Sequence, residues 1–287
     1  MQAITIDQLI ERYDALLFDA YGVLVDQQGV LDDAAPLIDR LNRIAKPYWI
    51  VTNDASRLPE TRGRWFREHG LAIGDAQVLT SGTLLVGYFQ RHDLVGARCI
   101  VIGPPDSRRY VTQAGGRVIE PSFDAELDAV VLCDEAGFDY LPTIDATLTA
   151  LYRTIDAGRT PRLVQPNPDL IYPKGPNAFG MAIGGIGLFF EAALALRYPG
   201  RGDLCFDKLG KPHRAIFEHA VSCAGTRDVV MIGDQLHTDI AGANAFGISS
   251  ALVETGIARF DAVPLAADLR PTYRLSSLRA GTPSASR

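Results

Sequence analysis

The fold is decided by the stretch LLFDAYGVL at residues 16–24. An apolar run that breaks at a carboxylate, an aromatic residue and a glycine is typical of a buried strand in a parallel sheet. Such a strand places Asp19 at the carboxyl edge of the sheet, where open α/β folds bind their ligands. Taken alone, these residues also fit a surface aspartate that ends a core strand, so the rest of the chain must decide.

Composition describes an ordered globular protein. The 287 residues are 47% hydrophobic and 22% charged, and the mean hydropathy is +0.05, which is enough length and apolar content for two domains with buried cores. The net charge is -6, and no basic stretch interleaves with aromatic residues. We therefore expect no nucleic-acid partner, although a small anionic substrate needs only a local positive site.

The sequence also predicts a cytoplasmic protein. Its four cysteines have no Cys-x-x-Cys spacing, which favours reduced core residues over disulfides or a metal site. The first 14 residues lack the cationic start and apolar core of a signal peptide. No apolar stretch approaches the roughly 18 residues that cross a bilayer, so no membrane association is expected.

The first part of the chain reads as a parallel α/β unit. Gln2 to Tyr13 is predicted to be a short helix, and residues 26–29 suggest a small hairpin over the end of the first strand. A helix over 33–45 leads to a second strand over 48–51, which should pair in parallel with the first. Thr52 and Asn53 end that strand and are expected on the same sheet edge as Asp19.

The middle of the chain restarts the same alternation. Strands are predicted near 99–102, 118, 129–133 and 163–165, with helices between them, so this segment is expected to form an inserted second domain. Residues 166–187 are rich in proline, glycine and asparagine and are predicted to be a long loop with a binding role. Their glycine spacing does not fit a dinucleotide-binding fingerprint.

The first domain resumes near residue 210. Lys211 is predicted to open a helix, and a buried strand over 229–232 runs into Asp234 and Asp239. Carboxylates that meet from separate strands repel one another unless a cation lies between them, and hard oxygen ligands suit Mg²⁺. A lysine, a hydroxyl and an amide beside that ion would hold phosphoryl oxygens.

These motifs, in this order, resemble the haloacid dehalogenase (HAD) superfamily, and specifically its class IIA phosphatases, the nitrophenylphosphatase, phosphoglycolate phosphatase and pyridoxal-phosphate phosphatase group. The resemblance implies a Rossmann-like doubly wound parallel sheet with an inserted α/β cap domain of the C2 type. We expect the core domain at 1–83 and 204–275, the cap at 84–203, and a disordered tail at 276–287. The motifs that carry the likeness are Val51-Thr52-Asn53, Thr80-Ser81-Gly82, Asn167-Pro168-Asp169, Gly210-Lys211-Pro212, Gly233-Asp234 and Thr238-Asp239.

The resemblance also assigns roles to individual residues. It implies that Asp19 is the nucleophile that forms an aspartyl-phosphate, with Lys211 neutralising charge on the phosphoryl oxygens. Mg²⁺ is implied between Asp19, Asp234 and the backbone carbonyl of Tyr21, and Asp239 is expected to ligate through water or to orient Lys211. The residues expected to bind substrate are Thr52, Asn53, Lys211, Asn167 and Asp169.

Tyr21 departs from the phosphatase pattern. These enzymes carry a second aspartate two residues after the nucleophile, which protonates the leaving group and then activates water. A phenol with a pKa near 10 is a poor base at neutral pH, and losing acid-base help costs roughly 10²- to 10⁴-fold in rate. Turnover is therefore expected to be weak, or to use another group, for which Asp26 and Asp54 are candidates.

The leading hypothesis is Mg²⁺-dependent hydrolysis of a small phosphorylated metabolite, with a homodimer through the cap as a further expectation. A phosphate-binding or regulatory protein with an impaired site is the alternative. A third reading is 2-haloacid dehalogenase chemistry, because the stretch at 19–22 resembles the first motif of those enzymes. Two features oppose it: only 33 residues separate Asp19 from Thr52, too few for a cap between them, and Asp234 with Asp239 keeps the metal-type motif.

Overall fold

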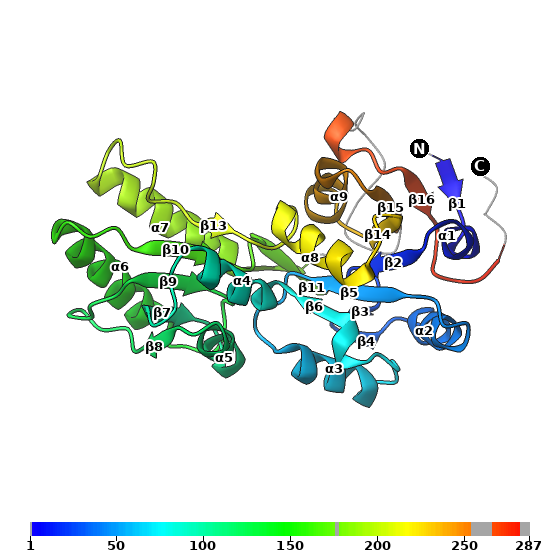
Figure 1. Cartoon of the computed structure of the whole chain (residues 1–287), viewed down its shortest axis with the longest axis horizontal. Coiled ribbons are helices and arrows are strands. Elements are labelled where there is room, and N and C mark those ends of the chain that lie inside the picture. Colours follow the sequence, from blue (N-terminus) through cyan, green and yellow to red (C-terminus); the bar gives the residue numbers. More distant parts are fainter. Residues whose placement is uncertain (1, 176–177, 254–265, 282–287) are drawn as a thin grey trace. The chain divides into compact units, whose positions relative to one another are not determined.

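The computed structural model describes residues 2–175, 178–253 and 266–281 (Figure 1). The chain forms two compact units. Unit 1 comprises Met1–Thr52, Pro59–Leu79 and Lys211–Arg287, and unit 2 comprises Asn53–Leu58 and Thr80–Gly210. Unit 2 therefore starts earlier and ends later than the expected cap at 84–203, and it includes the short segment after Thr52. The assignment of the units as core and cap domains stays a prediction.

Unit 1 is built on a seven-stranded sheet in the order β1-β16-β15-β14-β2-β5-β6. The pairs from β1 across to β5 are all parallel, so helices must cross over between them, and the expected α/β class is confirmed. The strands are β1 (Gln2–Ile4), β2 (Ala15–Phe18), β5 (Tyr48–Thr52), β6 (Val78–Thr80), β14 (Val229–Gly233), β15 (Ser249–Val253) and β16 (Tyr273–Leu275).

Helices cover both faces of this sheet. Figure 1 shows α2 and α3 on one face and α8 and α9 on the other. Leu16 and Phe18 of β2 pack into one apolar cluster with Leu37 of α2, while Leu17 is equally buried and points to the opposite face. The bounds are α1 (Ile6–Arg12), α2 (Ala34–Arg43), α3 (Pro59–Glu68), α8 (Arg214–Ala224), α9 (Ala241–Phe246) and the short segments η1 (Asp75–Gln77), η3 (Leu236–Ile240) and η4 (Ala267–Leu269).

The N-terminal helix prediction is wrong for the first residues. Gln2–Ile4 is strand β1, which pairs with β16 from the far end of the chain, a contact that local periodicity does not contain. The helix begins only at Ile6, because Thr5 caps it: the Thr5 hydroxyl accepts from the Gln8 N–H, and the Gln8 side chain accepts from the Thr5 N–H.

Residues 276–281 of the tail expected to be disordered are described, and two of them contact unit 1. Leu278 is buried in the apolar cluster of unit 1, and Arg279 pairs with Asp33 at 2.6 Å. Residues 282–287 of the predicted tail lie outside the described residues.

Unit 2 has its own five-stranded parallel sheet, in the order β13-β10-β9-β7-β8. Its strands are β7 (Arg98–Ile102), β8 (Arg117–Ile119), β9 (Ala129–Leu132), β10 (Arg162–Gln165) and β13 (Asp207–Lys208). Its helices are η2 (Ser81–Thr83), α4 (Leu84–Arg91), α5 (Pro105–Gln113), α6 (Tyr140–Asp156) and α7 (Ile183–Arg197). A separate core gathers Ile100, Val130, Leu151 and Phe190, as an independently closed α/β unit requires.

The predicted long loop at 166–187 is wrong in most of its length. It contains an antiparallel hairpin, β11 (Ile171–Gly175) with β12 (Ala178–Met181), and the first turns of α7. Two of its glycines allow close packing rather than loop flexibility: a Cβ on Gly184 would lie 2.4 Å from the Asp169 carbonyl oxygen, and one on Gly187 would lie 2.8 Å from Gln165 Oε1.

The small hairpin near residue 27 is confirmed as β3 (Val25–Asp26) paired with β4 (Gly29–Val30). All four cysteines are free, and no helix among the described residues has the length and apolarity needed to cross a membrane. The cytoplasmic location itself stays a prediction.

Candidate active site

Three strand ends of unit 1 meet at one edge of its sheet. Phe18 of β2 lies opposite Ile232 of β14 on one side and Ile50 of β5 on the other. The chain leaves β2 toward β5 and leaves β14 toward β15, so the strand order reverses between β2 and β14. Open α/β sheets form their binding crevice at such a reversal, and Asp19 and Asp234 are the residues that follow the two strands there.

Lys211 lies between two buried carboxylates. Its Nζ is 2.7 Å from Oδ1 of Asp19 and 2.7 Å from Oδ1 of Asp239. The three residues expose 2%, 4% and 0% of their surface respectively. A buried ammonium bound by two carboxylates leaves one net negative charge in the cluster, which suits a site that binds a further cation.

The backbone holds these side chains in place. The Asp19 N–H donates to the Ile232 carbonyl at 2.9 Å, so the nucleophile candidate is tied to β14. Asp239 lies in η3, and its Oδ2 accepts from the Gln235 N–H at 3.1 Å. Lys211 does not open a helix as expected: α8 begins three residues later, at Arg214, and Lys211 lies in the turn before it.

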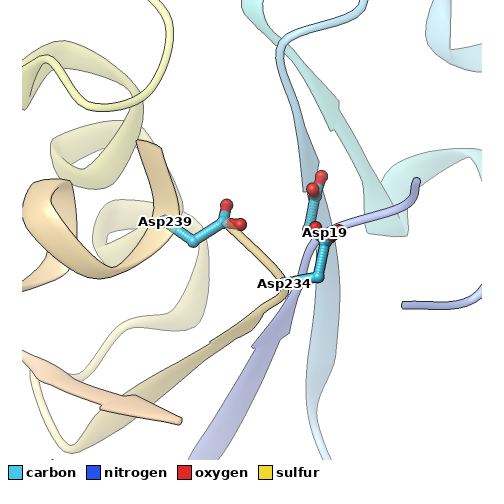
Figure 2. Close-up of side chains that lie close together, drawn as sticks. All are labelled: Asp19, Asp234 and Asp239. Carbon is cyan, nitrogen blue, oxygen red and sulfur yellow. The ribbon is translucent and has the colours of Figure 1, made fainter. Parts of the chain in front are cut away.

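The carboxylates of Asp19, Asp234 and Asp239 form a compact acidic group. Each offers an oxygen within 4.8 Å of the others, and all three residues are buried (Figure 2). Figure 2 shows them converging from the ends of β2 and β14 and from η3. Buried carboxylate oxygens at this spacing are a donor set for a hard divalent cation, so the residues present fit Mg²⁺.

Two glycines leave room for this group. A Cβ on Gly22, whose φ is +80°, would lie 2.2 Å from Oδ2 of Asp234. A Cβ on Gly233 would lie 2.3 Å from Oδ2 of Asp239. Any larger residue at position 22 or 233 would therefore collide with the carboxylate of Asp234 or Asp239.

Burial and charge set the protonation of the pair. Burial and the nearby Asp239 raise the pKa of Asp19 to about 7, against the opposing effect of Lys211. Burial alone would lower the pKa of Lys211, but Asp19 and Asp239 outweigh it and hold that pKa above its ordinary value, so Lys211 stays charged. A bound cation would favour the ionised, nucleophilic form of Asp19.

Comparison with known proteins agrees with this geometry. Family models described as haloacid dehalogenase-like hydrolase and HAD-hydrolase-like match residues 16–117 and 208–280. A solved structure described as a possible sugar phosphatase of the HAD superfamily, from Cytophaga hutchinsonii, is 30% identical, with a TM-score of 0.81 over 97% of this chain and 98% of its own.

This chain belongs to the HAD superfamily. An acid sugar phosphatase from Staphylococcus epidermidis is 25% identical over 94% of this chain and 96% of its own. A glycerol phosphate phosphatase from Mycobacterium tuberculosis, solved with magnesium, is 25% identical with a TM-score of 0.78, over 97% of this chain and 78% of its own. Together with the HAD-superfamily structure described above, these relatives place the chain among the class IIA phosphatases.

The structure divides the predicted HAD site residues between the units. Unit 1 brings together Asp19, Lys211, Asp234 and Asp239. Thr52, at the end of β5, is also in unit 1 and is buried. The roles assigned to these residues stay predictions.

Unit 2 brings together the other three predicted substrate-binding residues. The Asn53 amide donates to Oδ1 of Asp169 at 2.9 Å, and the Asp169 N–H donates to Oδ1 of Asn167 at 3.0 Å. Asn53 and Asn167 are buried. These residues therefore form one polar cluster, although more than a hundred residues separate Asn53 from the other two.

Tyr21, the position where the HAD motif departs, is partly buried and packs against the apolar cluster of unit 1. The two proposed substitutes for the missing aspartate both take part in turns: Oδ1 of Asp26 accepts from the Gln28 N–H at 2.7 Å, and Oδ1 of Asp54 accepts from the Ser56 N–H at 2.7 Å. Asp54 belongs to unit 2 and Asp26 to unit 1.

Sequence reasoning assigned no task to three glycines beside these residues. Gly22 and Gly233 flank the carboxylates, and a Cβ on Gly210 would lie 2.5 Å from Oδ1 of Asn53. All three lie within one or two residues of a predicted site residue. The position of each glycine next to a motif residue is a sequence signal for close packing. Only the fold shows which side chain occupies the space beside each glycine.

Proposed function

We propose that this protein is a Mg²⁺-dependent phosphatase of small phosphomonoesters, among which sugar phosphates are the leading class. One observation carries the proposal: a buried lysine bound to two carboxylates beside a third, at the reversal point of a parallel sheet. The name of one relative, acid sugar phosphatase, supports sugar phosphates, and the name of another, glycerol phosphate phosphatase, supports small phosphomonoesters in general.

The chain's own residues supply nucleophile and charge. An oxygen of Asp19 attacks phosphorus and forms an aspartyl-phosphate, which water then hydrolyses. Lys211 stays charged and stabilises the negative phosphoryl oxygens, and the Thr52 hydroxyl donates a hydrogen bond to one of them. Asp19, Asp234 and Asp239, with the Tyr21 carbonyl, would hold Mg²⁺, which when bound neutralises phosphoryl charge.

A substrate panel tests the proposal. Phosphate release from aryl, sugar and glycerol phosphates is measured with Mg²⁺ and with a chelator, beside the Asp19→Asn variant. We expect release that requires both Mg²⁺ and Asp19. Metal-dependent binding of phosphate without release from any ester would instead favour the regulatory alternative, and halide release from 2-haloacids would favour the dehalogenase.

A metal titration provides a second readout. Mg²⁺ that binds only the folded protein raises the melting temperature. We expect this shift in the wild type and its loss in Asp234→Asn, which removes one carboxylate charge from the group. An equal shift in both proteins would show that the ion binds elsewhere.

We further propose that unit 2 mediates a homodimer. In the hairpin, Ile171 pairs with Met181 and both are exposed on one face, and the Met181 side chain lies against Gly185 of α7. Leu188 and Phe189 follow one turn later on the same face of α7. The exposed apolar residues of this surface, which we call the apolar stripe, are Ile171, Phe179, Met181, Leu188, Phe189 and Leu196.

A second copy of the chain is the occupant that fits best. The stripe exposes on the order of 600 Å², against about 800 Å² per partner in a standard interface. It carries no charge, so two copies meet without repulsion across a two-fold axis. Light scattering should show a dimer that Phe189→Lys converts to a monomer, whereas Val95→Lys, at another exposed apolar position of unit 2, leaves it intact. A monomeric wild type would contradict the proposal.

A further inference from the structure

We infer, on the basis of the proposed phosphatase function, that this protein is selective for phosphate esters whose leaving group departs without being protonated. These are aryl, enol and hemiacetal phosphates, including sugars phosphorylated at the anomeric carbon. Simple alkyl phosphates, such as those of primary alcohols, are poor substrates. The inference rests on which side chains surround Asp19 and on where the Tyr21 ring lies.

The chemistry of the first step sets the requirement. As the Asp19 oxygen bonds to phosphorus, the bond from phosphorus to the ester oxygen breaks, and its electron pair stays on that oxygen. A general acid placed beside it supplies a proton and accelerates the step by roughly 10²- to 10⁴-fold. Without one, the oxygen leaves as an anion and takes a proton from water afterwards, so the rate depends on how stable that anion is.

The charged groups around Asp19 are engaged in ion pairs or belong to the acidic group that fits a cation. Lys211 is bound to Asp19 and Asp239 at 2.7 Å, where it balances the two carboxylates. Asp234 and Asp239 complete the acidic group that fits a divalent cation, and Asp239 also accepts from the Gln235 N–H. As candidate ligands of a cation, these carboxylates contribute oxygen lone pairs to it and are not positioned as proton donors.

Tyr21 follows the nucleophile by two residues, and its ring belongs to the apolar packing of unit 1. It packs against the buried cluster that contains Phe18 and Leu24, together with Val30 and Leu31 from the strand β4 side of the hairpin. Its backbone bridges to Val25. The side chain at this position therefore anchors the β3–β4 hairpin to the core and carries no carboxylic acid.

The carboxylate of the β3–β4 hairpin, Asp26, is also hydrogen-bonded. Oδ1 of Asp26 accepts from the Gln28 N–H and stabilises the turn between β3 and β4. Among the described residues of unit 1, the surroundings of Asp19 thus provide a nucleophile, a fixed positive charge and a cation site, but no carboxyl group reserved for proton transfer. We therefore expect the rate of the first step to depend on the stability of the leaving-group anion rather than on a general acid.

A leaving-group series tests the inference. The ratio kcat/KM is measured with saturating Mg²⁺ for substituted phenyl phosphates and for glycerol phosphate, because it reports the steps up to the formation of the aspartyl-phosphate. In the wild type we expect kcat/KM to fall about tenfold for each unit by which the leaving-group pKa rises. A shallow dependence, with glycerol phosphate as good a substrate as phenyl phosphate, would overturn the inference.

Two variants at one position sharpen the test. Tyr21→Asp restores a carboxyl group and should flatten the dependence, with a gain of roughly 10²- to 10⁴-fold on glycerol phosphate. Tyr21→Phe keeps the ring and removes the hydroxyl, and the dependence should stay steep. If Tyr21→Phe makes it steeper still, the phenol is the acid and the inference is wrong. Should Tyr21→Asp fail to fold, the wild-type series decides alone.

The same data separate this inference from the proposed function. If the wild type releases no more phosphate than Asp19→Asn from any ester, the phosphatase proposal itself fails. If release depends on Asp19 but not on the leaving group, the phosphatase proposal stands and the selectivity is refuted.

Discussion

The ammonium group of Lys211 lies 2.7 Å from Oδ1 of Asp239, the same distance that separates it from Asp19. One positive charge thus holds two carboxylates that come from separate elements of unit 1, the end of β2 and the segment η3. All three side chains are buried, so water does not screen the interaction. Lys211 is therefore both a stabilising contact and the group that would meet a phosphoryl oxygen.

Replacing Lys211 by methionine tests both its contribution to stability and its proposed contact with a phosphoryl oxygen. Lys211→Met leaves two buried carboxylates without their partner, and breaking a buried pair in this way costs about 3–5 kcal/mol in the free energy of unfolding. The loss of a charge that faces the transition state should lower kcat by about 10²- to 10³-fold. Urea unfolding and steady-state kinetics measure the two effects.

The matched control for Lys211 is Arg43→Met, which removes an exposed positive charge at the end of α2. We expect it to change both quantities little, because single surface substitutions alter stability by about 0.5 kcal/mol or less. Lys211→Arg should not restore activity, since a planar guanidinium does not fit a slot shaped for a compact ammonium. Full activity in Lys211→Met would refute the assigned role.

Gly22→Ala should damage the metal site specifically. The new Cβ would lie 2.2 Å from Oδ2 of Asp234, so that carboxylate must move. Misplacing one member of a metal site typically costs 10- to 100-fold in metal affinity, and we expect the apparent Mg²⁺ affinity to fall by about that factor. The affinity is measured from the Mg²⁺ dependence of activity and of the melting temperature.

Gly70→Ala is the matched control for Gly22. Gly70 has a similar φ of +89°, and a Cβ added there would meet nothing within 4 Å. Both variants therefore carry a backbone penalty of about 1–2 kcal/mol, but only Gly22→Ala collides with a carboxylate. Equal Mg²⁺ affinity in the two variants would contradict the prediction.

Much of the fold follows from local patterns in the sequence. The central strands of both sheets are short apolar runs, buried on both faces, and the hairpin near residue 27 has a turn that its sequence indicates. The strand β1 does not follow from local patterns, because its partner β16 is at the other end of the chain. The helix α7 was missed because its glycines, read as loop residues, pack against Asp169 and Gln165, and such contacts exist only in the folded unit.

The residues of the candidate site also divide into those that local patterns predict and those that depend on contacts in the folded protein. The residues at strand ends, Asp19 and Asp234, could be predicted to converge, because parallel strands of known order share an edge. The bond between Asn53 and Asp169 could not, since it depends on how a turn after β10 returns to the segment after β5. Nor does a motif show that Tyr21 packs against the core, because its partial burial depends on residues distant in the local pattern.

The hydrogen bond from Asn53 to Asp169 should be measurable by a double-mutant cycle. A hydrogen bond to a charged group contributes about 1.5–3 kcal/mol, and this one lies in a partly buried part of unit 2. Asn53→Ala, Asp169→Ala and the double variant should therefore show a coupling free energy of unfolding in that range. The exposed pair Arg201 and Asp203 provides the control, with an expected coupling below about 1 kcal/mol. Additive effects at Asn53 and Asp169 would show that their contact contributes nothing.

Asp134 should make the stability of unit 2 depend on pH. Burial, together with the neighbouring charge of Glu135, raises the pKa of Asp134 to about 7, against the effect of the Ala136 N–H that its carboxylate accepts. Between about pH 4 and pH 7 the folded protein holds a proton here that the unfolded chain has released. The free energy of unfolding therefore falls as the pH rises through this window, by about 1.4 kcal/mol per unit, and is lowest above pH 7.

Asp134→Asn removes this titration and keeps an oxygen for the Ala136 N–H. We expect the variant to unfold at a higher temperature than the wild type at pH 8 and to differ little from it at pH 4.5. Asp145→Asn removes a carboxylate from an exposed position of the same unit and should show no such crossover. Melting temperatures at the two pH values measure the effect. The variant should be more stable at pH 8 because a neutral asparagine avoids the cost of holding an ionised carboxylate in a partly buried place. A wild type and an Asp134→Asn variant whose melting curves stay parallel from pH 4.5 to pH 8 would show that Asp134 ionises freely in the folded protein.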